Sequence, residues 1–154
     1  MLLKKIAIGL SVSWLATSAY SGTYVYISNI EDADITAYEL TTETSPHLNF
    51  IGRFPAGKFV MPMATSPDGK YLYASVRSKP LSLYMYQIDQ GTGRLKWIGA
   101  IPLPDSMVYV STDKTGKWLV ATSYGGHINS VSQIQANGYI NPVPVEVFQS
   151  GGKK

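Results

Sequence analysis

A chain of 154 residues is long enough for one ordinary domain or for a part of a larger one. With 45% hydrophobic and only 15% charged residues, the chain is expected to fold rather than to stay disordered. The net charge of +3 includes Lys4 and Lys5, and the other Lys and Arg residues are scattered, so we expect neither a nucleic-acid nor an anionic-lipid partner. The absence of cysteine excludes disulfides and thiolate metal sites, and leaves the compartment open.

The first residues have the pattern of a secretory signal peptide, predicted here as residues 1–19. Two lysines precede 11 apolar residues, Ile6–Ala16, and the small residues Thr17–Ala19 offer a cleavage site. A hydrophobic first strand or an uncleaved anchor would also be apolar, but a bilayer span needs about 20 residues. We therefore expect a periplasmic or secreted protein without membrane contact after cleavage, or a cytoplasmic one if the leader is not functional.

From residue 20 onward the chain repeats itself three times. Gly22, Gly69 and Gly116 are spaced by 47 residues, and each precedes an aromatic strand by two residues. These strands read YVYIS, YLYASV and WLVATS, and such nearly continuous apolar runs are expected where both faces of a strand are covered. The tetrapeptides SPDG and DKTG, which end at the second and third glycines, predict type I turns.

Each copy continues with an alternating strand and an outer strand, and the second and third copies also have an inner strand. The alternating strands end ITAYEL, LYMYQI and NSVSQI, and the inner strands read FVMPMAT and SMVYVST. The outer strands begin LNFIG at Leu48 and LKWIG at Leu95, and the third copy is degenerate, with YINPV at Tyr139 inside an expected outer strand INPVPVEVF. The repeating unit therefore has four short strands.

Four strands in a repeat of about 45 residues predict an all-β fold, a β-propeller of four-stranded antiparallel blades. A β-sandwich is the competing interpretation, but a sandwich does not require a fixed period. The expected partial propeller, residues 20–154, has blades at about 20–56, 57–103 and 104–148. The first blade lacks its innermost strand, because the leader occupies that position.

The result is an incomplete arc of just under three blades, whereas propellers generally have four to eight. Such an arc exposes apolar blade faces and unpaired strand edges, so self-association through these edges is expected. We therefore expect the chain to be a fragment of a longer protein.

The order and spacing of several segments resemble one family. These are TYVYISN, ITAYEL, SPDGKYLYASVRS, LSLYMYQID, GRLKWIGAI and SYGGHINSVSQI. Together they resemble the N-terminal part of the seven-bladed propeller lactonases, which include propeller-type 6-phosphogluconolactonases and fungal carboxymuconate-lactonising enzymes. The resemblance covers Thr23 to about Val147.

The resemblance implies hydrolysis of the ring ester of a sugar lactone without a metal or an organic cofactor. The family's His, Glu and Arg residues for this chemistry lie in later blades, and the His belongs to a His-x-x-Asn motif that no position here matches. No catalytic residue is therefore assigned, and the chain alone is expected to be inactive. The alternative is a non-catalytic propeller that serves as a binding or interaction module. Export would favour a non-phosphorylated lactone.

In a propeller, the loops after the second strands lie on the same face as the entries to the innermost strands. That face would collect Arg77 to Lys79, Asp105 and Tyr124 to His127. We take Arg77, Tyr124 and His127 as candidate substrate-binding residues. The guanidinium can hold a carboxylate or phosphate, and the tyrosine can stack on a sugar. A solvated arginine, a packed tyrosine and a histidine with no carboxylate beside it are the alternatives.

No metal site is predicted. The acidic loop Glu31–Asp34 lacks the glycine and the terminal glutamate of a calcium loop, which favours a solvated turn. The patterns GxSxG, HExxH, GxGxxG and GxxxxGK[ST] do not occur, so serine-hydrolase, zinc-protease, dinucleotide and P-loop functions have no support.

Overall fold

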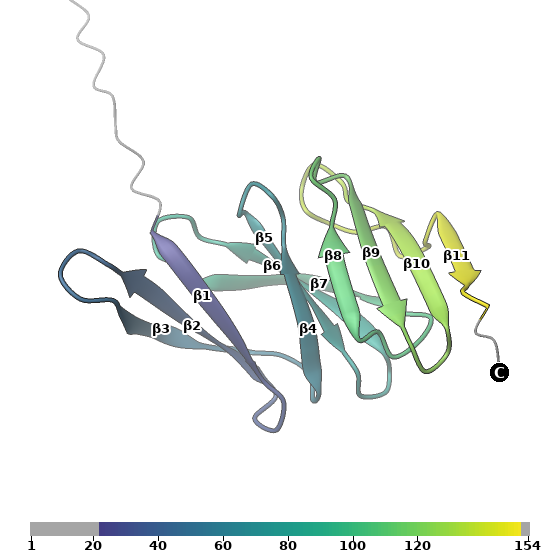
Figure 1. The fold of residues 1–154 in the computed structure, drawn as a ribbon, viewed down its shortest axis with the longest axis horizontal. Coiled ribbons are helices and arrows are strands. Elements are labelled where there is room, and N and C mark those ends of the chain that lie inside the picture. Colours follow the sequence, from purple (N-terminus) through teal and green to yellow (C-terminus); the bar gives the residue numbers. More distant parts are fainter. Residues whose placement is uncertain (1–21, 152–154) are drawn as a thin grey trace, which may run out of the picture.

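The computed structural model describes residues 22–151, and the predicted leader, residues 1–19, lies outside them. Three antiparallel sheets stand side by side in a row, sheet 1 in purple and blue and sheet 3 in green and yellow (Figure 1). No helix among the described residues is long and apolar enough to cross a bilayer. The all-β expectation is confirmed.

The sheets follow one another along the chain, and in each the strands pair with their neighbours in sequence. Sheet 1 contains β1 (Thr23–Asn29), β2 (Asp34–Thr41) and β3 (His47–Pro55). Sheet 2 contains β4 (Val60–Thr65), β5 (Tyr71–Val76), β6 (Ser82–Ile88) and β7 (Leu95–Pro102). Sheet 3 contains β8 (Tyr109–Thr112), β9 (Trp118–Ser123), β10 (Ile128–Gln133) and β11 (Glu146–Gln149).

The two predicted turns are present before β5 and β9. The backbone N–H of Gly69 donates to the Ser66 carbonyl at 2.9 Å, and that of Gly116 donates to the Asp113 carbonyl at 3.0 Å. Both glycines have a left-handed backbone, with φ of 70° and 69°, which glycine adopts without steric cost. The repeated glycine therefore fixes the chain reversal that opens each aromatic strand.

Two hydrophobic cores lie between the sheets and are built from alternating residues of the central strands. Ile35 and Ala37 of sheet 1 pack against Leu72 and Ala74 of sheet 2. On the other face of β5, Tyr73 joins the core shared with sheet 3. The prediction that β5 is covered on both faces is therefore confirmed.

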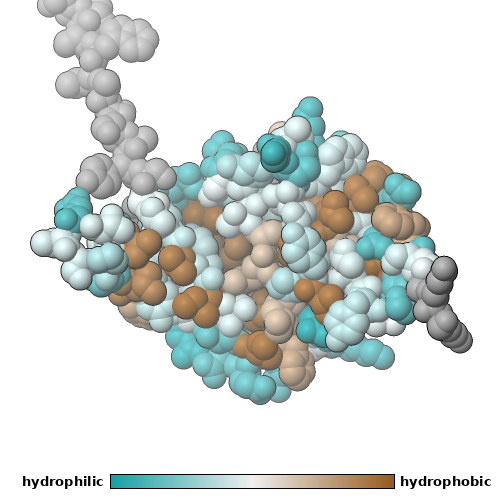
Figure 2. Space-filling view, in the orientation of Figure 1, coloured by the Kyte–Doolittle hydropathy of each residue, from teal (hydrophilic) through white to brown (hydrophobic). Residues whose placement is uncertain are grey.

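The same prediction is wrong for β9 within the described residues. Leu119 and Ala121 are buried against sheet 2, whereas Trp118 and Val120, on the opposite face, are 37% and 36% exposed. Of the described residues, none forms a further sheet on this side. The outward face of sheet 1 is likewise apolar and exposed at Ile27, and hydrophobic surface is visible over sheet 1 in Figure 2.

A repeated contact, which we call the tyrosine–glycine latch, joins neighbouring sheets. The Tyr26 hydroxyl donates to the Gly93 carbonyl at 2.9 Å, and the Tyr73 hydroxyl donates to the Gly138 carbonyl at 3.1 Å. Both glycines have positive φ, 67° and 79°. A methyl group on Gly138 would overlap the ring of Tyr71, and one on Gly93 would overlap the equivalent ring in sheet 1. Each latch thus places an aromatic ring and a hydroxyl on the same glycine.

The outer strand of sheet 3 differs from the expected continuous strand INPVPVEVF. Ile140 forms a single bridge with Ile134, and regular pairing resumes only at β11. Pro142 and Pro144 lie between the two and lack a backbone N–H, so they cannot donate to the ladder. The third repeat is degenerate at this point for that reason.

Candidate functional site

Five connections lie at one end of the three sheets, which we call the loop face. They are residues 30–33, 56–59, 77–81, 103–108 and 124–127. The antiparallel pairing places them together, since each second strand ends, and each inner strand of sheets 2 and 3 begins, at this end. The loop face is therefore the one predicted to hold the site.

A continuous set of hydrogen bonds connects three of these loops. The Arg77 Nε donates to the Ser106 Oγ at 3.0 Å, and the Ser106 backbone N–H donates to the Asp105 carboxylate at 2.7 Å. The other carboxylate oxygen of Asp105 accepts from the Ser123 hydroxyl at 2.5 Å. The Gly126 N–H donates to the Ser123 oxygen at 3.2 Å. Sheets 2 and 3 thus share one polar cluster at the loop face.

The cluster holds its two charged groups in different ways. The Ser123 hydroxyl and the Ser106 N–H stabilise the carboxylate and lower the pKa of Asp105, so it is ionised at neutral pH. Arg77 is half-buried and forms no ion pair with any described residue. Only its Nε is used, so its terminal nitrogens can bind the oxygens of a carboxylate, phosphate or carbonyl group.

The other two candidate residues lie in the loop between β9 and β10 and are exposed. Tyr124 is 72% exposed, and the imidazole of His127 has no hydrogen-bond partner among residues 22–151. His127 has a left-handed backbone, with φ of 54°, and its carbonyl accepts from the Ser150 N–H at 2.9 Å. The structure therefore joins Arg77 to the cluster but brings neither Tyr124 nor His127 into hydrogen-bond contact with it.

Two serines of the cluster were missed by sequence reasoning. Ser106 follows Asp105 directly, and Ser123 ends the apolar strand β9. Ser123 is 2% exposed, and a buried hydroxyl at the end of a strand needs a partner. The position of Ser123, a polar residue at the end of a strand that begins with four apolar residues, is the signal that could have indicated it.

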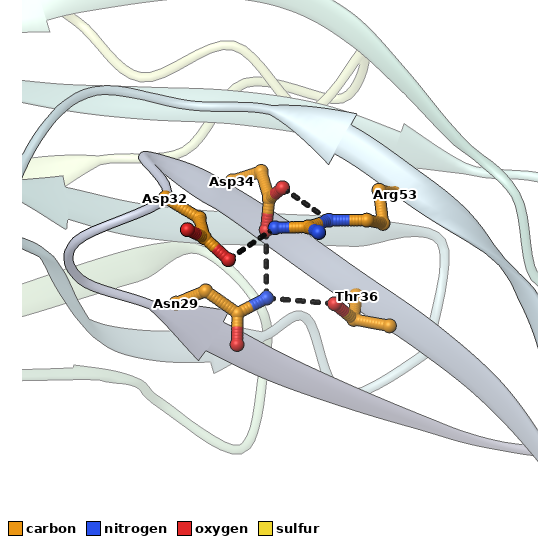
Figure 3. A network of polar contacts seen from close by, with 5 residues as sticks. All are labelled: Asn29, Asp32, Asp34, Thr36 and Arg53. Atoms are coloured by element: carbon orange, nitrogen blue, oxygen red, sulfur yellow. Dashed lines mark hydrogen bonds and ion pairs between the residues drawn. The ribbon is translucent and has the colours of Figure 1, made fainter.

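The acidic loop is exposed at its first two residues, as predicted, and two of its carboxylates also form an ion-paired network (Figure 3). The guanidinium of Arg53 binds the carboxylates of Asp32 and Asp34, the latter at 2.5 Å. The Asn29 amide donates to Asp34 at 2.6 Å and to Thr36 at 2.7 Å. Burial opposes ionisation of Asp34, but the hydrogen bonds from Arg53 and Asn29 outweigh it and lower its pKa. Within residues 22–151, no group of three or more His, Cys, Asp or Glu side chains could hold a metal ion.

The family model and the curated relatives indicate the same family. The family model described as "Lactonase, 7-bladed beta-propeller" matches residues 18–154. The 6-phosphogluconolactonase of Erwinia tasmaniensis is 37% identical over 114 residues, which are 74% of this chain and 33% of that protein. The 6-phosphogluconolactonase of Serratia proteamaculans is 34% identical over 116 residues, 75% of this chain and 34% of that protein.

The fold is also found among solved structures. The periplasmic gluconolactonase of Pseudomonas aeruginosa superposes with a TM-score of 0.74 at 12% identity, over 83% of this chain and 37% of that one. The propeller arc predicted from the repeat is confirmed. The resemblance to the propeller lactonases is confirmed as well. The chain spans about a third of the length of the curated relatives that it matches.

Proposed function

Because the chain belongs to the seven-bladed β-propeller lactonase family, we propose that its loop face is part of the sugar-lactone site of such an enzyme. The observation that carries the proposal is Arg77, which Ser106 holds by Nε at the junction of sheets 2 and 3. A guanidinium fixed in this way can bind an anionic or carbonyl oxygen with little further loss of side-chain freedom.

Hydrolysis of a lactone requires a donor for the developing oxyanion and a group that moves the proton of the attacking water. Arg77 is suited to the first role or to anchoring the substrate's own anionic group. Asp105 is not suited to the second, because its lowered pKa makes it a weak base and both oxygens accept hydrogen bonds. We therefore propose that these three sheets bind the lactone and that they do not hydrolyse it by themselves.

Tyr124 and His127 complete the proposed binding surface. The ring of Tyr124 is free to stack on the apolar face of a sugar, and the imidazole of His127 is free to bond with a hydroxyl. If the predicted leader directs export, a non-phosphorylated lactone is the natural substrate. The similarity of the fold to a periplasmic gluconolactonase supports this choice.

Isothermal titration calorimetry with the 154-residue chain tests the proposal. The ligands are gluconate and 6-phosphogluconate, the stable ring-opened products of the two lactones. We expect Arg77→Ala to weaken binding about tenfold or more, as for the loss of a charged hydrogen bond, and Arg77→Lys to restore part of it. Lys117→Ala removes the same charge at the opposite end of the sheets and is expected to leave affinity unchanged. Equal losses in the Arg77→Ala and Lys117→Ala variants would refute a specific anchor.

The same experiment addresses the substrate and the lack of turnover. If Arg77→Ala weakens the binding of 6-phosphogluconate more than that of gluconate, Arg77 contacts the phosphate. If the two affinities fall equally, Arg77 contacts the carboxylate or the hydroxyl groups that both ligands share. Lactone hydrolysis is followed separately as acid release in a pH-stat. Acceleration by the chain alone, abolished in Arg77→Ala, would contradict the proposal that these sheets only bind.

A further inference from the structure

A cleft lies on the outer flank of the molecule, between sheets 1 and 2. Its volume is about 460 Å³, within the range of ligand pockets. The walls are formed by Phe54 and Pro55 of β3, Tyr84 and Tyr86 of β6, and Leu95 and Trp97 of β7. No residue of the Arg77 cluster lines it, so its chemistry is separate from the proposed lactone site.

The walls are aromatic but carry free hydrogen-bond donors. Trp97 is 57% exposed, which is unusual for so large an apolar side chain. The Tyr86 hydroxyl donates to the Pro55 carbonyl at 2.8 Å, so that acceptor is already used. In the part of the chain that the structure describes, neither the Tyr84 hydroxyl nor the Trp97 indole N–H has a partner. The cleft thus presents flat rings beside two donors, and no carboxylate lines it.

The two tyrosines of the cleft are not part of the repeated pattern. The equivalents of Tyr84 and Tyr86 in sheet 3 are Ser130 and Ser132, which pair with the corresponding positions of β9. Both serines are almost fully buried, at 2% and 4% exposure. Two bulky aromatic residues in sheet 2 therefore stand where sheet 3 has small polar ones, and both of these tyrosines line the cleft.

One cation lies at the rim. The guanidinium of Arg94 stacks 5.4 Å from the centre of the Phe54 ring, and its Nη1 donates to the Ile51 carbonyl at 3.4 Å. Arg94 is exposed and has no carboxylate within 4.0 Å among residues 22–151. The aromatic surface therefore adjoins one unneutralised positive charge.

We propose that this cleft binds an extended, proline-rich peptide segment that carries an acidic residue beside its prolines. A polyproline II helix has no internal hydrogen bonds, so its carbonyls are free to accept from Tyr84 and Trp97. Its proline rings pack on aromatic walls at a low entropic cost, as in other aromatic-lined grooves. The acidic side chain pairs with Arg94. The cleft therefore has a group for each part of such a segment: aromatic rings for the prolines, two donors for the carbonyls and one cation for the acidic side chain.

The test uses the synthetic peptide acetyl-Pro-Pro-Glu-Pro-Pro-Pro-amide and the 154-residue chain in isothermal titration. We expect binding that Trp97→Ala weakens about tenfold or more, the effect of removing an aromatic anchor. Trp118→Ala, which removes an exposed tryptophan from the outward face of sheet 3, is expected to change the affinity less than about twofold. Far-ultraviolet circular dichroism of both variants checks that they are folded.

Two further comparisons test the ligand chemistry. Replacing Glu by Lys in the peptide is expected to weaken binding about three- to tenfold, and Arg94→Ala is expected to abolish this difference. Replacing the prolines by glycines is expected to abolish binding at the same concentrations. The proposal is overturned if the peptide does not bind at millimolar concentration, if the glycine peptide binds equally, or if Trp97→Ala and Trp118→Ala have the same effect. Benzoate, a small aromatic anion without prolines or a peptide backbone, is the control for a small-molecule ligand. If benzoate binds and the peptide does not, the proposal is also overturned.

Discussion

Replacement of Gly138 by alanine is expected to lower the free energy of unfolding by about 2–5 kcal/mol, the sum of two costs. The first arises from the backbone, since φ is 79° and an alanine in the left-handed region costs about 1–2 kcal/mol. The second arises from packing, since the new methyl group overlaps the ring of Tyr71. Overpacking of this kind costs about 1–3 kcal/mol.

The assay is urea unfolding of the full chain, followed by far-ultraviolet circular dichroism. Gly125→Ala is the matched control, because no atom of the described residues beyond its chain neighbours lies within 4 Å of the added methyl group, and it is expected to change stability by less than about 0.5 kcal/mol. Gly93→Ala repeats the test at the other latch, where φ is 67°. A Gly138→Ala variant as stable as the control would refute the packing of sheet 3 on sheet 2 described here.

Two more predictions concern single polar groups. Tyr73→Phe leaves the buried Gly138 carbonyl without its donor and is expected to cost about 1–3 kcal/mol in the same urea assay, and an unchanged midpoint would contradict the latch. Hydrogen bonds, first from the Thr115 hydroxyl and then from backbone N–H groups, lower the pKa of Asp113 to about 2. Since the unfolded value is about 3.9, this carboxylate stabilises the fold fully above that pH and loses its effect as the pH falls to about 2. The stability difference between wild type and Asp113→Asn, measured by urea midpoints, should therefore be constant from about pH 5 to 7 and shrink between about pH 4 and 2, and a difference that persists at pH 2 would be inconsistent with this account.

The sheets could be predicted from the sequence because the signals that form them are local. A glycine followed two residues later by an aromatic run recurs every 47 residues, and each signal needs only its neighbours along the chain. The break in the third outer strand was harder to predict, although Pro142 and Pro144 were visible. A degenerate repeat shows which residues align with the other copies, but it does not show where the outer strand stops pairing with its neighbour.

The polar cluster of the candidate site was predicted only in part, because its contacts join residues that are distant in sequence. The topology placed Arg77 and Asp105 on one face, but the partner of each depends on how two sheets pack. Ser106 lies 29 residues from Arg77, and Ser123 lies 18 from Asp105. The tyrosine–glycine latch was missed for a related reason, since its two glycines are 45 residues apart and fall outside the period of 47.

In the third repeat a valine stands at the position of the latch tyrosine, so the outward face of sheet 3 lacks the hydroxyl that joins the other sheets. Val120 occupies the position of Tyr26 and Tyr73, and the strand that carries it is otherwise alike. The hydroxyl of Tyr26 or Tyr73 donates to one carbonyl, and this directional bond fixes the distance and the angle of the neighbouring sheet. The side chain of Val120 has no polar group, so it can pack against any apolar surface. A partner that packed on this side of the molecule would therefore have to obtain its alignment from its own polar groups, because Val120 supplies no directional contact.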